Sequence, residues 1–123
     1  MDALSWIYIA NATLIILHEM DSAYRREWEL FRLPGGIGGF LVIHVPIFLI
    51  LLYGLIEINK STFAGFVISL LLCVGGIAGF TIHMFFIKRG NADFKNAASL
   101  AILIAAFAVS LVQLFLTIGA MKG

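Results

Sequence analysis

Four long stretches without a charged residue dominate the pattern of this chain. They cover residues 3–18, 33–56, 61–87 and 96–121, with lengths of 16, 24, 27 and 26 residues. A helix needs about 17–25 apolar residues to span the hydrocarbon core of a bilayer, so three stretches are long enough and the first is at the limit. Apolar residues fill them without strict alternation, which favours membrane-spanning helices over the strands of a β-barrel.

The pattern therefore predicts an all-α membrane protein, a four-transmembrane-helix bundle in a single domain over residues 1–123. We place the helices at about residues 3–20, 37–58, 62–87 and 94–121. Short polar links join the second helix to the third and the third to the fourth, so consecutive helices run antiparallel. The first helix has neither the basic region nor the cleavage pattern of a secretion signal, so we expect it to be retained.

Residues 21–33 follow a different pattern. Apolar side chains recur at helical spacing on one face, and charged side chains occupy the opposite face; the apolar set is Met20, Ala23, Tyr24, Trp28 and Phe31. This pattern is typical of a short amphipathic helix in the membrane interface, with its aromatic rings at the depth of the headgroups. We expect such a helix between the first two transmembrane helices.

Composition excludes two classes of protein. Apolar residues make up 62% of the chain and charged residues 12%, against roughly 45–50% and about 25% in an ordinary soluble domain. A water-soluble fold is therefore excluded. The net charge of +1 and the lack of a contiguous basic face exclude nucleic acid as a partner. The single cysteine, Cys73, cannot form an intrachain disulfide.

The distribution of basic residues predicts the orientation. Most lie in the first and third links, and only Lys60 and Lys122 lie on the opposite side. The larger set is Arg25, Arg26, Arg32, Lys88, Arg89 and Lys95. Because cytoplasmic loops carry the excess of lysine and arginine, we expect the first and third links in the cytoplasm and both termini outside.

Ionisable residues inside membrane helices are costly, which makes them functional candidates. The three histidines, His18, His44 and His83, all fall in the cytoplasmic half of the predicted bundle. His18 ends the first helix, and His44 and His83 lie about 10 Å and about 7–8 Å deep at 1.5 Å of rise per residue. We expect them to supply three ligands to zinc or another divalent metal, with water in the fourth position.

Three acidic residues, Glu19, Asp21 and Glu27, lie at the same end of the predicted bundle. His18 and Asp21 are three residues apart and share a helical face, so Asp21 can bind the cation beside His18 or orient its imidazole. We expect the three carboxylates to act as a general base or as hydrogen-bond partners of the metal ligands. A cytoplasm-facing site of this kind suits hydrolysis or modification of a lipid.

Other functions remain open. His44 and His83, at similar depth on antiparallel neighbours, are also compatible with a bis-histidine haem. Metal-free acid–base chemistry on a lipid, or transport of a small polar solute, is a further alternative. The histidines can equally form structural hydrogen bonds in a small accessory subunit. The expected partners are membrane lipids, with a second copy of the chain or a larger membrane complex as further possibilities.

Small residues predict where helices pack closely. Gly75 and Gly79 are four residues apart in the third helix, where Gly76 widens the groove, and Ala97, Ala101 and Ala105 repeat this spacing in the fourth. Because small residues let helix backbones approach each other in lipid, we expect both faces to be buried contacts.

Polar residues inside the helices predict a further contact. Ser110, Gln113 and Thr117 form a polar stripe in the outer half of the fourth helix, at the depth of Asn11 in the first. We expect a hydrogen bond between Asn11 and Gln113 that joins the two helices.

A short segment carries a family resemblance. His18-Glu19-Met20-Asp21, Trp28-Glu29-Leu30-Phe31 and Pro34-Gly35-Gly36 resemble small uncharacterised bacterial membrane proteins of the group named for a His-x-x-Glu-Glu motif (HXXEE-like). Asp21 and Ser22 stand where that motif has its two glutamates. The resemblance implies no established activity. It implies a bacterial inner-membrane protein in which His18 and Asp21 do more than pack.

Overall fold

The computed structural model describes residues 2–90 and 96–123, and all regular secondary structure in these residues is helical. The helices are α1 (Ala3–Tyr24), α2 (Glu27–Leu30), α3 (Gly36–Asn59), α4 (Phe63–Lys88) and α5 (Ala97–Lys122). All except α2 are long and apolar enough to cross a membrane. The prediction of an all-α bundle with four transmembrane helices is confirmed, and the chain is a small integral membrane protein.

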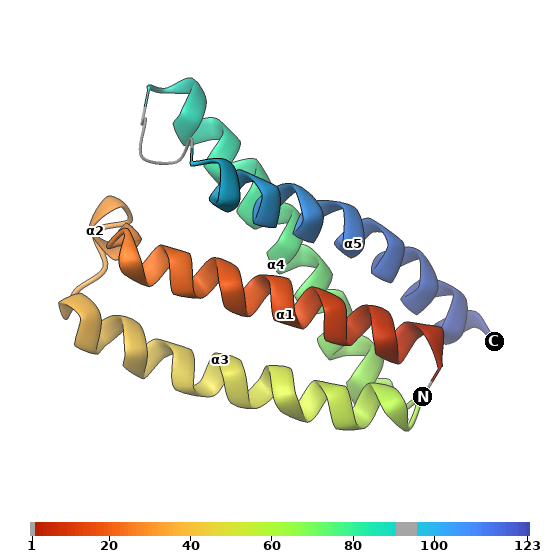
Figure 1. The fold of residues 1–123 in the computed structure, drawn as a ribbon. Coiled ribbons are helices and arrows are strands. Elements are labelled where there is room, and N and C mark those ends of the chain that lie inside the picture. Colours follow the sequence, from red (N-terminus) through yellow and green to blue (C-terminus); the bar gives the residue numbers. More distant parts are fainter. Residues whose placement is uncertain (1, 91–95) are drawn as a thin grey trace.

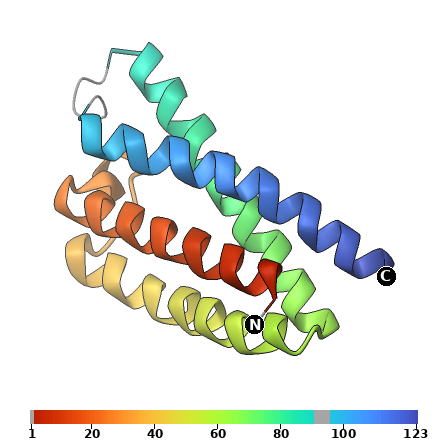
Figure 2. The ribbon, with the colours of Figure 1, turned by 45° about the vertical axis from the view of Figure 1, so that its right-hand side comes forward.

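Helix α1 lies at the centre of the bundle. It packs against α3 on one side and α5 on the other, and α4 crosses behind it to contact α3, α5 and α1. The two termini and the α3–α4 link lie at one end of the molecule, and α2 lies at the opposite end (Figures 1 and 2). We call these the terminal end and the α2 end. Figure 2 shows α3 and α4 close together at their hairpin and apart at the α2 end.

Two glycines explain why α3 and α4 are closest near the terminal end. A Cβ atom at Gly65 would lie 2.5 Å from the carbonyl carbon of Glu57, so only glycine allows this approach of the two backbones. A Cβ atom at Gly54 would lie 2.3 Å from the hydroxyl of Tyr8, which donates a hydrogen bond to the carbonyl of Leu51 at 2.6 Å. The first, third and fourth helices are thus fixed to one another at the terminal end.

A buried polar network joins α1, α4 and α5 in the middle of the bundle. The Nδ2 group of Asn11 donates to Gln113 Oε1 at 2.8 Å and to Ser110 Oγ at 3.0 Å, which confirms the predicted bond between Asn11 and Gln113. Gln113 Nε2 then donates to Ser69 Oγ at 2.8 Å, and Ser69 Oγ lies 2.7 Å from Thr117 Oγ1. All five side chains are fully buried. Such bonds hold helices together where no water competes.

The predicted small-residue contact faces are confirmed at Gly76 but not at Gly75, Ala97 or Ala101. Gly75 is exposed, and a Cβ atom placed there would meet nothing within 4 Å; Ala97 and Ala101 are also exposed. The close contact between α4 and α5 lies one residue further along α4, where a Cβ atom at Gly76 would be 2.0 Å from Ser110 Oγ. Spacing alone does not fix the rotation of a helix about its axis, which here points Gly76 into the contact.

The segment between the first two transmembrane helices also differs from the expectation. Helix α1 continues to Tyr24, and α2 covers only four residues of the interfacial helix expected at residues 21–33. Arg26, which precedes α2, has φ +54°, a left-handed conformation that ends α1 and reverses the chain. The predicted apolar face is therefore interrupted, with Tyr24 at 85% exposure and Trp28 at 7%.

Two details of the sequence interpretation lie outside the described residues. These are the start of the last helix, expected at Phe94, and Lys95, which was counted among the basic residues. In the described part, α5 is preceded by Asn96, whose side chain accepts hydrogen bonds from the backbone N–H groups of Ala98 and Ser99. This is the usual stabilisation of a helix N-terminus by an asparagine.

Candidate metal site

Three helices bring two histidines and one glutamate together at the α2 end. His18 comes from the last turns of α1, Glu27 is the first residue of α2, and His83 lies near the end of α4. One ligand atom from each of these side chains lies within 4.8 Å of the other two. Glu27 and His83 are buried, and His18 is half-buried. We call these three residues the His18–Glu27–His83 cluster.

The hydrogen bonds of His83 favour a positive charge in this cluster. Its Nδ1 atom lies 2.9 Å from the carbonyl oxygen of Gly79, and its Nε2 atom lies 3.0 Å from Oε1 of Glu27. Both neighbours are acceptors, so each ring nitrogen needs an N–H group to donate. A neutral imidazole carries only one N–H. With Glu27 ionised, either the ring is an imidazolium, or a metal ion takes the place of the proton between Nε2 and Glu27.

Glu27 is held as a carboxylate. Its Oε2 atom accepts a hydrogen bond from the Ser22 hydroxyl at 2.8 Å, and its Oε1 atom faces His83. Burial raises the pKa of the Glu27 carboxyl, but the hydrogen bonds from His83 and Ser22 outweigh this effect and hold the pKa below its usual value. The ionised group is the form that accepts hydrogen bonds and binds cations.

His18 completes the cluster from the side. Its ring meets that of His83 edge to face, with the two centroids 4.8 Å apart. Gly79 of α4 lies beside this ring, and a Cβ atom at Gly79 would lie 3.9 Å from His18 Nε2, an ordinary van der Waals contact. The small residue is therefore at the point where α1 and α4 approach each other beside the cluster.

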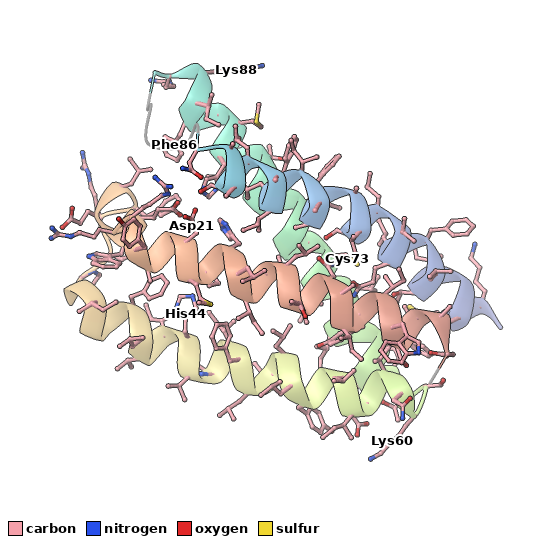
Figure 3. The ribbon with its side chains drawn as sticks, viewed as in Figure 1. Asp21, His44, Lys60, Cys73, Phe86 and Lys88 are labelled. Atoms are coloured by element: carbon pink, nitrogen blue, oxygen red, sulfur yellow. The ribbon has the colours of Figure 1, made fainter. Side chains whose placement is uncertain are left out.

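His44 belongs to a separate pair. Its Nε2 atom lies 2.7 Å from Oε2 of Glu19, and its Nδ1 atom lies 2.7 Å from the carbonyl oxygen of Phe40. The ring of Phe40 stacks on the imidazole at a centroid distance of 4.0 Å. In Figure 3 His44 projects between α3 and α1. The structure thus brings His18 and His83 together with Glu27, whereas the sequence interpretation grouped the three histidines as ligands.

Asp21 does not take the position expected for it beside His18. Its Oδ1 atom forms an ion pair with Nε of Arg25 at 3.0 Å, one helical turn further along. This pair lies at the end of α1, at the same end of the bundle as His44 (Figure 3). The short i, i+4 separation on one helix favours this ion pair over a contact with His18.

A cavity of about 190 Å³ joins both histidine–glutamate pairs. It is lined by five of the six residues singled out from the sequence, with Asp21 outside the lining: His18, Glu19, Glu27, His44 and His83. Trp28 and Phe40 form part of its wall, with ring centroids 5.6 Å apart. The α2 end therefore contains one partly polar cavity with two carboxylates and three imidazoles around it.

Comparison with known proteins adds a family but no activity. Residues 4–120 match the model of a family of unknown function, DUF6713. The chain belongs to this family. The match agrees with the expectation of an uncharacterised family, but it does not support membership of the His-x-x-Glu-Glu group. No curated protein and no solved structure matches the chain.

Two features of the site in this DUF6713 protein were not foreseen from the sequence. Ser22 lies one helical turn after His18, and its hydrogen bond to Glu27 was not expected. Glu27 was expected to be a general base and lies in the cluster with His18 and His83. Its placement depends on the left-handed backbone of Arg26, and arginine gives no sequence signal for such a turn.

The arrangement fits a tetrahedral metal ion better than a haem. Zinc bonds of about 2.0–2.2 Å place neighbouring ligand atoms about 3.3–3.6 Å apart. To bind such an ion, the 3.0 Å distance between His83 Nε2 and Glu27 Oε1 lengthens slightly. The ring nitrogen of His18, which lies within 4.8 Å of the other two ligand atoms, moves closer to them. The haem alternative receives no support, because the Nε2 atoms of His44 and His83 each face a glutamate. The cavity is also smaller than the about 300–1,000 Å³ usual for larger ligands.

Proposed function

We propose that this protein is an integral membrane metalloprotein in which His18, Glu27 and His83 bind one divalent ion, with zinc as the best match. The observation that carries the proposal is the convergence of three ligand atoms within 4.8 Å from three different helices. Imidazole nitrogens and a carboxylate oxygen are the ligands that zinc takes in proteins. Three protein ligands leave the fourth position to water.

The charges around the site support a cation. The two nitrogens of His83 both face acceptors, and Glu27 accepts from Ser22 on its other oxygen, so the space between Nε2 and Oε1 favours a positive charge. With the Nδ1 proton donated to the Gly79 carbonyl, the neutral ring carries its lone pair on Nε2, which faces Glu27. This is the form of the ring that binds a metal.

We further propose that the site faces the cytoplasm of a bacterial inner membrane. Lys60 and Lys88 lie at opposite ends of the molecule (Figure 3), and Lys88 is at the α2 end together with Arg25, Arg26, Arg32 and Arg89. The excess of basic residues at that end is the pattern of a cytoplasmic surface. The cavity then opens where lipid headgroups meet the cytoplasm.

The chemistry we propose is hydrolysis of a lipid ester. A divalent ion held by His18, Glu27 and His83 would lower the pKa of a bound water, and Glu19, which lines the same cavity, would accept the proton of that water. In the ester hydrolysis that this would support, the water oxygen bonds to the ester carbonyl carbon, the bond from that carbon to the alcohol oxygen breaks, and Glu19 gives the proton to the departing alcohol oxygen. His44, hydrogen-bonded to Glu19, positions this carboxylate.

The experiment is elemental analysis of detergent-purified protein that carries an affinity tag without histidine. Zinc is added and free metal is removed by dialysis before the measurement. We expect close to one equivalent in the wild-type protein and in His44→Ala, and a loss in His83→Ala and Glu27→Gln. His44→Ala is the matched control, because His44 lines the same cavity but lies outside the cluster.

Two results would overturn the proposal. One is a wild-type protein that retains no metal, and the other is equal loss of metal in His44→Ala and His83→Ala. The three histidines are then structural hydrogen-bonding groups. Copurification of other membrane proteins would in that case point to an accessory subunit of a larger complex.

A further inference from the structure

A second hollow of about 380 Å³ lies between α1, α3 and α4. Most of its wall is aliphatic and includes Ile15 of α1, Ile47 and Ile50 of α3, and Ile68 and Leu71 of α4. These residues lie in the membrane-spanning parts of the helices. We call this hollow the aliphatic crevice.

The aliphatic crevice meets the polar cavity at one end. His18, Glu19 and Gly79 line both hollows. His18 is also a member of the cluster proposed to bind metal. A molecule that fills the crevice and extends past Gly79 therefore places its next atoms beside the cluster.

Missing side chains on α4 keep the crevice open. Gly75 and Gly79 both line it, and a Cβ atom at Gly75 would meet nothing within 4 Å. The sequence predicted that these two glycines pack against another helix, and the structure shows no such contact for Gly75. Their small size creates space on the α4 wall.

The length of the crevice matches one leaflet of a bilayer. Its α4 wall extends from Ile68 to Gly79, which corresponds to about 16 Å at 1.5 Å of rise per residue. The hydrocarbon core of a membrane is about 30 Å thick, so one leaflet contributes about half of that. A helix of the same length would occupy more than about 1,000 Å³, so an occupant that lies wholly within the crevice is thinner than a helix.

We propose that the aliphatic crevice holds one acyl chain of a membrane lipid, with the ester end of that chain at the His18–Glu27–His83 cluster. Aliphatic walls select a hydrocarbon chain, and the shared lining sets the position of the polar end. The identity of the substrate class, an acyl ester lipid, rests on the proposed metal-dependent function. Occupation of the crevice by an acyl chain does not depend on that function.

The test uses the whole protein in bilayer nanodiscs that contain a phospholipid with a photoactivatable diazirine in the middle of one acyl chain. After illumination, adducts are mapped by peptide mass spectrometry. We expect adducts to concentrate on residues 68–79 of α4 and 47–51 of α3. Gly75→Leu fills the crevice and should reduce these adducts severalfold.

Gly119→Leu is the matched control, because Gly119 is also exposed and a Cβ atom there meets nothing within 4 Å. It should leave the adduct pattern unchanged. Adducts spread evenly over the exposed faces of α3 and α5, or undiminished by Gly75→Leu, would overturn the crevice proposal.

Zinc content is measured on the same samples, so the two proposals fail separately. Retained zinc with lost adducts in Gly75→Leu supports an acyl site that is distinct from the metal ligands. Absence of zinc from the wild-type sample overturns the metal function, while the adduct pattern still decides whether the crevice holds an acyl chain.

Discussion

The Nε2 atom of His83 lies 3.0 Å from Oε1 of Glu27, although 56 residues separate them in the chain. This contact joins the end of α4 to the short helix α2, and both side chains are buried. Removal of one member of a buried charged pair leaves the other without a partner. The relationship therefore bears on stability as well as on metal binding.

In the metal-free protein, Glu27→Ala should be strongly destabilising. Loss of one partner of a buried ion pair costs about 3–5 kcal/mol, and Ser22 also loses its acceptor. The measurement is reversible unfolding in mixed detergent micelles with increasing denaturing detergent. Glu29→Ala, an exposed position on the same helix, is the control and should change the free energy of unfolding little. Equal effects of the two substitutions would contradict this account of Glu27.

The ionisation of Glu27 should persist below the pH at which an ordinary glutamate takes up a proton. Its folded-state pKa lies below the usual 4.5, so its contribution to stability is present above that value and is lost as the pH falls through the folded pKa. Infrared spectra of the metal-free protein at pH 4.5, where an ordinary glutamate is half protonated, should show Glu27 mostly ionised, with Glu27→Gln as the reference. A carboxylic acid band that corresponds to half of Glu27 or more and disappears in Glu27→Gln at that pH would contradict the prediction.

The buried polar network should contribute measurably to helix association. Asn11→Ala removes two hydrogen bonds to α5, and bonds of this kind in membrane proteins contribute about 0.6–2 kcal/mol. Thr13→Ala is the control, because Thr13 is exposed and donates only to the carbonyl of Ile9 on its own helix. Unfolding in mixed micelles should show a loss for Asn11→Ala and little change for Thr13→Ala. The opposite order would refute the assigned role of the network.

The α3–α4 hairpin should not tolerate a side chain at Gly65. Because a Cβ atom would lie 2.5 Å from the Glu57 carbonyl carbon, Gly65→Ala forces the two backbones apart. Overpacking of this type costs about 1–3 kcal/mol. Gly119→Ala adds the same methyl group in open space and should be neutral or slightly stabilising. The melting temperatures of the two variants in detergent test this prediction. Equal melting temperatures would contradict the predicted clash at Gly65.

The proposed orientation is testable by labelling. Cys73, which is buried, is the single cysteine of the chain. The substitution Cys73→Ser therefore provides a background without a native thiol. In intact cells, a membrane-impermeant maleimide should label Lys60→Cys, while Lys88→Cys should react only after the membrane is opened. Labelling of Lys88→Cys in intact cells would reverse the orientation.

The transmembrane helices were predictable because their signal is local and strong. A charge-free run longer than about 17 residues has few structures available in a membrane or in water. Topology alone then places His18, His44 and His83 at one end. What the pattern does not determine is the rotation of each helix about its axis. That rotation pairs His44 with Glu19, turns His83 towards Glu27, and points Gly76 into the contact with α5.

The position of Glu27 was beyond sequence reasoning for another reason. Left-handed turns are recognised from glycine or asparagine, and here the residue at φ +54° is Arg26. The turn follows from the burial of Glu27 and Trp28 against the ends of α1, α3 and α4. A tertiary contact thus fixes a local conformation for which the residue type itself is unfavourable.

X-ray absorption at the zinc edge of the zinc-loaded protein tests the central claim most directly. The account predicts four nitrogen or oxygen ligands at about 2.0–2.1 Å with outer-shell scattering from two imidazoles. His83→Ala should lose one imidazole or the metal itself, and His44→Ala should leave the spectrum unchanged. A six-coordinate ion without imidazole scattering, or a spectrum that changes in His44→Ala and not in His83→Ala, would contradict the assignment of His18, Glu27 and His83 as the metal ligands.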